Sequence, residues 1–397
     1  MPVPQRVILL SADHMRADTI GAYGHPHVVT PNLDRLASGG VNFRQCYCQS
    51  PLCMPSRASF MTGLYPQQTG VTTLGRDLPG DFSPTLPGLF RDGSFRTVHI
   101  GKLHLQSHDN HDQRGDGDES YGFDHMERSE ERGCYEDAYV RWLRGEHPEA
   151  VECFRTPRPS DPQRAVGEKL GTVVDAPWQL SHSGWVVEVA TRYLNGGGLA
   201  EPRLLLNLGF HNPHPPLNPT REAFAQYEHA KLPAPLYAES EWQDKPEPMR
   251  GMLRDREDWT DAELVEYVRY FYALITEFDF AIGQLLDCLE AADELDNTLI
   301  AFTSDHGDMC GDHRITHKNT HFYDEEMRVP LIVHWPAGLG KERRDVSGLV
   351  ELTDLLPTLL ELSGLAVPPV LAGHSLADVL LAGEAGEKIR EDVFAFH

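Results

Sequence analysis

Short runs of apolar residues recur along the chain and are separated by longer amphipathic stretches. Each run is long enough for one buried strand. The five clearest runs are residues 7–11, 96–100, 204–208, 298–303 and 329–334. Residues 261–291 instead repeat apolar residues at three- and four-residue spacing, which predicts a long helix. Alternation of this kind predicts an α/β fold in which helices sandwich a central, mostly parallel sheet.

Three other segments add to this outline. Thr30 precedes Pro31, so we expect a capping threonine followed by a short helix, and residues 352–362 predict a closing helix. The segment 106–171 is acidic, rich in Gly, Asp and Arg, and has little periodicity. We interpret it as a variable insertion near the mouth of the site, and a solvated surface segment without function is the alternative.

Polar, reactive side chains follow four of the apolar runs. In open α/β sheets ligands bind beyond the carboxyl ends of the strands, so a single site can gather side chains from all four runs. The residues concerned are Asp13, Lys102, His104, His211, His214, Asp305 and His306.

Composition limits the partners. The 397 residues are 40% hydrophobic, which is enough for a substantial core. The formal net charge of −25 argues against nucleic acid or an anionic membrane surface as a partner. An anionic substrate would therefore need positive charge placed locally in its site.

The cysteines and the N-terminus indicate the compartment. Seven cysteines form an odd set without the spacing of a disulfide or zinc framework, which predicts reduced thiols. The first apolar run, residues 7–10, is too short for a signal peptide or a membrane span. We expect a cytoplasmic protein, and the sequence leaves open whether it forms a homo-oligomer.

The run Cys53-Met54-Pro55-Ser56-Arg57, followed by Thr62-Gly63, carries the most specific signal. It resembles the signature of the type I sulfatases of the alkaline phosphatase superfamily, particularly iduronate- and choline-sulfatase-like members. In that family the cysteine is oxidised to formylglycine (3-oxoalanine), whose hydrated aldehyde attacks sulfur. A buried, unmodified thiol is the alternative reading of Cys53.

Further matches extend the resemblance over most of the chain. They are Gly101-Lys102-Leu103-His104, Pro213-His214-Pro215-Pro216, Asp305-His306 and His317-Lys318. The resemblance implies an alkaline phosphatase-like fold with a catalytic domain at residues 1–372. Residues 373–397 would begin a C-terminal subdomain, apparently short or truncated, with its first strand at 391–397.

The resemblance also implies the site residues. The implied catalytic residues are Cys53, Arg57, Lys102, His104, His214 and Lys318, of which Lys102, His214 and Lys318 would also bind substrate. His104 would take the second diol proton, and His214 or Lys318 would assist the leaving alkoxide. We expect weaker roles, as supporting or substrate-contacting residues, for His182, His211 and His317.

One divalent metal ion is implied, with Asp13, His14, position 53, Asp305 and His306 as ligands. The family favours Ca²⁺, which prefers oxygen ligands. Many relatives have Asp or Gln where this chain has His14, and two imidazoles beside two carboxylates shift the preference toward Mn²⁺, with Mg²⁺ also open. Direct ligation by His14 is our expectation, and a hydrogen bond from His14 to a ligand is the alternative.

The predicted function is hydrolysis of sulfate esters through a sulfo-formylglycine intermediate at Cys53, after maturation by a formylglycine-generating enzyme. The substrate would be a small sulfate ester of a sugar, an aryl alcohol or choline. Phosphonate monoester hydrolases and phosphodiesterases of the superfamily are the first alternative, although they resemble this chain less at Lys102 and His104, where they carry Tyr and Thr. An inactive anion-binding homologue with unmodified Cys53 is the second.

Overall fold

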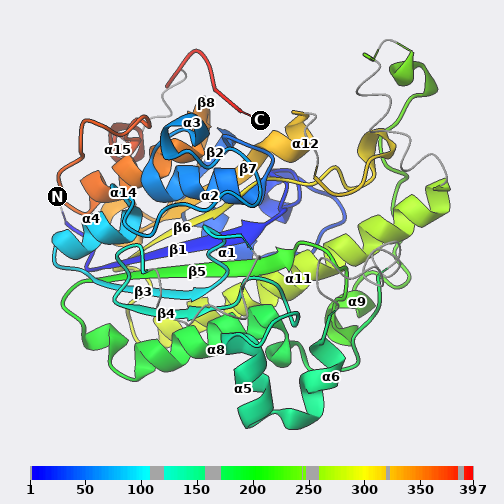
Figure 1. Ribbon diagram of the computed structural model, residues 1–397, viewed down its shortest axis with the longest axis horizontal. Helices are drawn as coiled ribbons and strands as arrows, with labels where there is room; N and C mark the ends of the chain where they lie inside the picture. Colours follow the sequence, from blue (N-terminus) through cyan, green and yellow to red (C-terminus); the bar gives the residue numbers. More distant parts are fainter. Residues whose placement is uncertain are drawn as a thin grey trace.

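One eight-stranded sheet forms the centre of the protein (Figure 1). The computed structural model describes residues 2–107, 120–156, 171–243, 245–246, 259–318, 322–382 and 389–396. The strands are β1 (Arg6–Asp13), β2 (Val41–Tyr47), β3 (Arg96–Gly101), β4 (His125–Arg128), β5 (Leu204–Pro213), β6 (Thr298–Ser304), β7 (Arg328–His334) and β8 (Arg344–Glu351). All five strands predicted from the apolar runs are present.

The strands are ordered β4-β3-β5-β1-β6-β7-β2-β8, and only β7 runs against the direction of the others. The prediction of a mostly parallel sheet is therefore confirmed. The order places β3, β5, β1 and β6 side by side, so that their carboxyl ends meet at one edge of the sheet.

Helices cover both faces of the sheet, and β1 shows why. Ile8 and Leu10 pack into the core on one face, whereas Val7 and Leu9 pack into the core on the other. The first core includes side chains of α1 (Pro31–Ser38), α8 (His182–Asn195) and α11 (Asp261–Ala291). The second includes those of α2 (Cys53–Thr62), α4 (Leu86–Asp92) and α14 (Leu355–Leu362). The predicted helix at 261–291 is thus confirmed, and the one at 352–362 is present as a 3-10 helix (Leu352–Asp354) that continues into α14.

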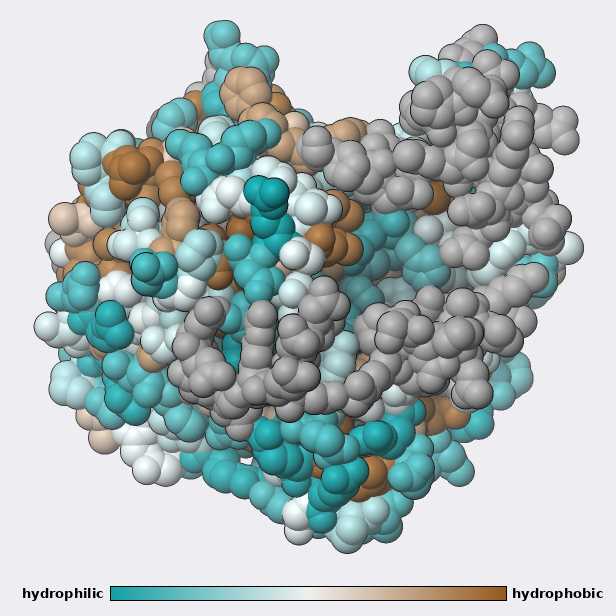
Figure 2. All heavy atoms as spheres, in the orientation of Figure 1, coloured by the Kyte–Doolittle hydropathy of each residue, from teal (hydrophilic) through white to brown (hydrophobic). Residues whose placement is uncertain are grey.

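The other α-helices in the described residues have between four and nine residues. They are α3 (Pro66–Thr69), α5 (Ala138–Glu146), α6 (Val151–Phe154), α9 (Arg221–Ala225), α12 (Asp324–Met327), α13 (Pro336–Leu339) and α15 (Ala377–Leu381). None of the helices that the structure describes is both long and apolar enough to cross a membrane. On the face drawn in Figure 2, hydrophobic side chains form scattered patches among hydrophilic ones.

The segment 106–171 is only partly separate from the sheet. Its residues 108–119 and 157–170 lie outside the described part of the chain. Between them, β4 pairs in parallel with β3, and α5 contributes Tyr139, Val140 and Leu143 to the first core. Sequence periodicity did not reveal β4 because it is a four-residue edge strand whose side chains are mostly polar.

The strand expected at 391–397 is wrong for the described residues. Residues 389–396 contain no strand and instead run along the end of the sheet, where the main-chain N–H of Phe394 donates to Glu351 Oε1 at 2.6 Å. Arg390 pairs with the buried carboxylates of Glu351 and Asp354. These polar contacts satisfy the backbone and the charges without a partner strand. Helix α15 packs Ala377 and Leu380 into the second core.

The N-terminus of α1 differs from the prediction. Thr30 is the N-cap residue, but its side chain makes no capping hydrogen bond and donates to Asp34 instead. The cap comes from Asp279 of α11, which accepts the main-chain N–H of Leu33 at 2.7 Å and of Asn32 at 3.1 Å. Asp279 is therefore the polar link between two helices that share the first core.

Asp279→Ala should lower the free energy of unfolding by about 2–4 kcal/mol, because it leaves main-chain N–H groups at the start of α1 without their acceptor. Urea denaturation followed by circular dichroism measures this change. The matched control is Asp287→Ala on the same helix, whose 72% exposed side chain pairs with Arg35. It should cost less than about 1 kcal/mol, and equal effects of the two substitutions would contradict the capping role.

Candidate active site

The carboxyl ends of β3, β5, β1 and β6 gather the predicted reactive residues. Asp13 ends β1, and Lys102 from the loop after β3 places its Nζ 2.8 Å from Asp13 Oδ2. Asp305 and His306 follow β6, and His306 Nε2 lies 3.7 Å from Asp13 Oδ1. These contacts join the ends of β1, β3 and β6, and the ring of His214 after β5 lies 4.3 Å from that of His14, so the ends of all four strands meet in one place as expected.

Cys53 is the first residue of α2 and is buried against this group. Pro55 fits in the first turn because the N–H groups there have no partner within the helix. Cys53 Sγ lies 3.2 Å from His306 Nε2 and 3.7 Å from Asp13 Oδ1, and it also contacts Lys318 Nζ. Burial, followed by the charge of Asp13, raises the pKa of the Cys53 thiol to about 12. The unmodified side chain is therefore a neutral thiol at neutral pH.

Arg57 lies one helical turn after Cys53, as predicted, and is almost completely buried. Its Nε donates to Asp305 Oδ2 at 2.8 Å, and its Nη2 lies 3.5 Å from Asp13 Oδ2. Burial alone would lower the pKa of Arg57, but Asp305 and Asp13 raise it above its ordinary value. The guanidinium thus bridges the two carboxylates and ties α2 to the ends of β1 and β6.

Asp13, Cys53, Asp305 and His306 form a group whose potential ligand atoms all lie within 4.8 Å of one another. Burial alone would raise the pKa of Asp13, yet Lys102 and the other cations hold it well below its ordinary value, so the carboxylate is ionised. Burial lowers the pKa of His306, and its Nδ1 faces the Gly307 carbonyl at 2.8 Å, which leaves the Nε2 lone pair toward the group. This donor set fits a divalent cation.

His14 lies beside this group. It belongs to a second potential ligand set with Asp13, Cys53 and His214. In the structure, however, His14 Nδ1 lies 2.8 Å from Asp308 Oδ2, and His14 Nε2 lies 2.8 Å from Lys318 Nζ.

The loop after β3 carries Lys102 and His104. Burial would lower the pKa of Lys102, but Asp13 and then Glu131 raise it, so Lys102 is a buried ammonium. The main-chain N–H of His104 donates to Glu130 Oε2 at 2.7 Å, and its φ of 51° places it in the left-handed region. Glu130 thus fixes the backbone at His104, while the catalytic role of the His104 imidazole stays a prediction.

The end of β5 supplies two histidine side chains. The His214 ring lies 4.3 Å from that of His14 and 4.7 Å from that of His211, measured between ring centroids. His211 Nε2 faces Glu131 Oε2 at 3.4 Å. His182 is buried farther out, 6.0 Å from the His211 ring. His317 Nδ1 lies 3.4 Å from the hydroxyl of Tyr267. The three histidines for which we expected weaker roles, His182, His211 and His317, therefore lie around the group formed by Asp13, Cys53, Asp305 and His306.

The family model of the sulfatases matches residues 5–365. The chain belongs to the sulfatase family. It is accordingly a sulfuric ester hydrolase, and its central sheet is alkaline phosphatase-like, as the resemblance implied.

Individual relatives agree with this placement. The sulfatase chain is 28% identical to an arylsulfatase from Clostridium perfringens, over 94% of this chain and 78% of the relative. It is 29% identical to the iduronate 2-sulfatase of Homo sapiens, over 91% of this chain and 70% of the relative. A solved structure, the phosphonate monoester hydrolase of Agrobacterium radiobacter, is 26% identical with a TM-score of 0.80, over 96% of this chain and 78% of that chain.

Sequence reasoning assigned no role to three residues that the sulfatase site contains: Glu131, Tyr267 and Asp308. Asp308 lies three residues after Asp305, close to the matched pair Asp305-His306, so its proximity to that pair could have pointed to it. Glu131 lies in the aperiodic segment 106–171, and Tyr267 lies within the apolar pattern of α11. No sequence signal separates these two from ordinary surface or core residues.

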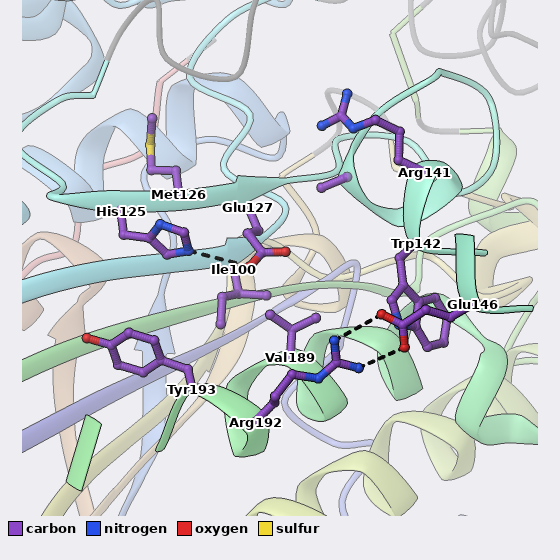
Figure 3. Close-up of a pocket in the computed structure, with 11 residues that line it drawn as sticks. Ile100, His125, Met126, Glu127, Arg141, Trp142, Glu146, Val189, Arg192 and Tyr193 are labelled. Carbon is purple, nitrogen blue, oxygen red and sulfur yellow. Dashed lines mark hydrogen bonds and ion pairs between the residues drawn. The ribbon is translucent and has the colours of Figure 1, made fainter. Parts of the chain in front are cut away.

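A cavity of about 560 Å³ lies apart from this sulfatase site, between β4, α5 and α8 (Figure 3). None of the predicted site residues lines it. Arg192 within it is held by Glu146 through two contacts of 3.0 Å, so its charge is already paired. The cavity is therefore no candidate for the sulfate-binding site.

Asp13→Asn and Asp305→Asn should each weaken divalent-metal binding by at least about tenfold, because each removes a full charge from the ligand set. Calorimetric titration of chelator-treated protein with Ca²⁺ and Mn²⁺ measures the affinity. Asp124→Asn is the control, since Asp124 accepts the Thr97 N–H at the opposite end of β3. Wild-type affinity in both site variants would show that the metal site is assigned wrongly.

Proposed function

We propose that this sulfatase hydrolyses sulfate esters by a covalent route in which position 53 carries formylglycine made from Cys53. The observation that carries the proposal is the position of Cys53 Sγ, buried at the start of α2 against His306, Asp13 and Lys318. A nucleophile at this point would lie beside the potential metal ligands and at the positive end of a helix.

The chemistry of the thiol supports the modification. A thiol with a pKa of about 12 is almost entirely protonated at neutral pH and is therefore a weak nucleophile. The hydrated aldehyde offers two hydroxyls instead: one attacks sulfur with departure of the alcohol, and the other loses its proton so that the C–O bond to sulfate breaks. A formylglycine-generating enzyme would be the maturation partner.

Asp13, Asp305, His306 and position 53 would hold one divalent cation. When bound, the cation lowers the pKa of the attacking hydroxyl and stabilises negative charge on the sulfuryl oxygens. The family favours Ca²⁺, while the imidazole of His306 also suits Mn²⁺, and Mg²⁺ remains a third candidate.

The chain supplies its own cations for the anionic substrate. The protein carries a net charge of −25, yet Lys102 pairs with Asp13 and Lys318 contacts Cys53 in the site. Burial lowers the pKa of His214, and its Nδ1 faces the Pro215 carbonyl, so Nε2 is left without a proton. Lys318 is accordingly the better-suited donor to the leaving alkoxide, with His214 as a substrate contact.

The substrate class that we propose is a small sulfated sugar, because the iduronate 2-sulfatase of Homo sapiens matches over 91% of this chain. Aryl sulfates and choline sulfate are the other candidates. The structural match to a phosphonate monoester hydrolase favours a second function, hydrolysis of phosphonate monoesters. Lys102 and His104, which replace the Tyr and Thr implied for those hydrolases, favour the sulfate ester.

Protein co-expressed with a formylglycine-generating enzyme should contain an aldehyde at position 53. Peptide mass spectrometry would detect it, because one sulfur and two hydrogens leave and one oxygen enters. Cys53→Ala should retain the fold and lose more than about a thousandfold in sulfate ester turnover. An unmodified thiol in fully active protein would refute the covalent route, and an unmodified, inactive protein would favour the anion-binding homologue.

The same preparation decides between the two esters. We expect the kcat/KM for sulfated sugars or 4-nitrophenyl sulfate to exceed that for a 4-nitrophenyl phosphonate monoester. The reverse order would assign the chain to phosphonate hydrolysis.

His104→Ala should separate attack from release. If His104 accepts the proton that allows sulfate to leave, its loss slows release by about 10²–10⁴-fold while bond cleavage to the alcohol still occurs once. Stopped-flow assays should show a burst of alcohol close to one equivalent per modified site, and the protein should gain the mass of a sulfuryl group. A slow linear time course without an adduct would remove His104 from the release step.

A further inference from the structure

His14 occupies the position where the resemblance implied a metal ligand, but both of its ring nitrogens have other partners. The side chain is buried, and its φ of 71° lies in the left-handed region, which is unfavourable for a residue other than glycine. The main-chain N–H of His14 donates to Asp305 Oδ1 at 3.3 Å. The backbone at this position is thus held in a strained conformation that fixes where the imidazole points.

The partners determine the tautomer of His14. The Lys318 ammonium can only donate, so His14 Nε2, 2.8 Å from Lys318 Nζ, must accept with its lone pair. His14 Nδ1 then carries the proton and donates to Asp308 Oδ2 at 2.8 Å.

Asp308 is itself held in place. Its Oδ1 accepts the main-chain N–H of Cys310 at 2.7 Å, and the hydroxyl of Tyr267 lies 3.4 Å from the same oxygen. Asp308 is completely buried. The chain of contacts therefore runs from α11 through Asp308 and His14 to Lys318, whose Nζ also contacts Cys53 Sγ.

We propose that His14 and Asp308 position Lys318 against residue 53 and that His14 is not a ligand of the metal ion. Direct ligation of the metal ion by His14, which the resemblance implied, is the alternative that the experiments below test. A neutral imidazole has one available lone pair, and a metal ion at Nε2 would have to displace an ammonium from it. The metal ion would then be bound by Asp13, Asp305 and His306 together with position 53. The role of Lys318 in binding the sulfuryl group rests on the proposed function, whereas the statement about the metal does not.

Metal titration tests the statement that His14 is not a ligand of the metal ion. Chelator-treated protein is titrated with Ca²⁺ and with Mn²⁺ by calorimetry, using wild type, His14→Ala and Asp13→Asn. We expect His14→Ala to change the metal affinity by less than about threefold, while Asp13→Asn, which alters a ligand, loses at least about tenfold. A loss in His14→Ala as large as that in Asp13→Asn would overturn the inference. Circular dichroism verifies that each variant is folded.

Sulfate titration tests the statement that His14 and Asp308 position Lys318, and it requires no turnover. Inorganic sulfate is titrated into the metal-loaded wild type, His14→Ala, Asp308→Asn, Lys318→Ala and the double variant His14→Ala/Lys318→Ala. We expect each single variant to bind sulfate about tenfold more weakly, because the ammonium loses its fixed position or is absent. The double variant should be no weaker than Lys318→Ala alone, since His14 acts through Lys318.

Conservative replacement gives a further readout. His14→Gln retains one acceptor for Lys318 and one donor for Asp308, so it should recover most of the sulfate affinity that His14→Ala loses. His25→Ala, a half-buried histidine beside Tyr272, is the matched control and should bind sulfate as wild type does. Additive losses in the double variant, or wild-type sulfate affinity in His14→Ala, would refute the positioning role. If wild type itself binds no sulfate, the proposed function fails, and the metal titration still decides the place of His14.

Discussion

Two buried carboxylates, Asp13 and Asp305, lie at the ends of the neighbouring strands β1 and β6, where their like charges would repel each other. Arg57 lies between them, donating to Asp305 at 2.8 Å and approaching Asp13 to 3.5 Å. Removing one partner from a buried ion pair typically costs 3–5 kcal/mol, because the remaining charge is left uncompensated. Through the guanidinium of Arg57, Asp13 and Asp305 anchor the helix that begins at Cys53. The same two carboxylates lie next to Cys53 in the site.

The charge distribution of the molecule follows from this arrangement. An acidic protein would repel a sulfate ester, and its surface offers no general attraction for one. Within the site the positive charge comes from Arg57, Lys102 and Lys318, where partial or full removal from water makes each interaction stronger. Asp13 and Asp305 hold Arg57 in place, Asp13 also pairs with Lys102, and a divalent cation would complete the balance. Specificity for an anionic group therefore depends on a small number of buried contacts.

Much of this organisation could be predicted from the sequence. Apolar runs ending in polar residues predicted the strands and the edge at which Asp13, Lys102, His214 and Asp305 meet, because a parallel sheet brings such ends together. What could not be predicted depends on contacts between distant segments. Asp279 caps α1 from 247 positions away, so the nearby Thr30 was the only visible candidate. Glu131 comes from a segment without periodicity.

His14 is a second case in which contacts between distant segments could not be predicted from the sequence. The resemblance implied that residue 14 is itself a metal ligand, and the structure places its ring beside Asp13 and His306. Which of its two nitrogens faces which partner depends on Asp308 and Lys318, which come from the loop after β6. A sequence pattern of metal ligands thus predicts which residues lie close together. Whether one of them binds the metal ion or a neighbouring side chain depends on its hydrogen-bond partners.

The central claim is that one centre, formed by the ends of β1 and β6 and the start of α2, binds both the metal ion and the sulfuryl group. A crystal structure of the protein with Mn²⁺ and inorganic sulfate, with anomalous scattering recorded for manganese, tests it most directly. We predict one manganese peak at ligand distance from Asp13, Asp305 and His306, with sulfate against residue 53 and within reach of Lys102 and Lys318. A manganese peak away from these carboxylates, or sulfate bound elsewhere with residue 53 unoccupied, would contradict the account.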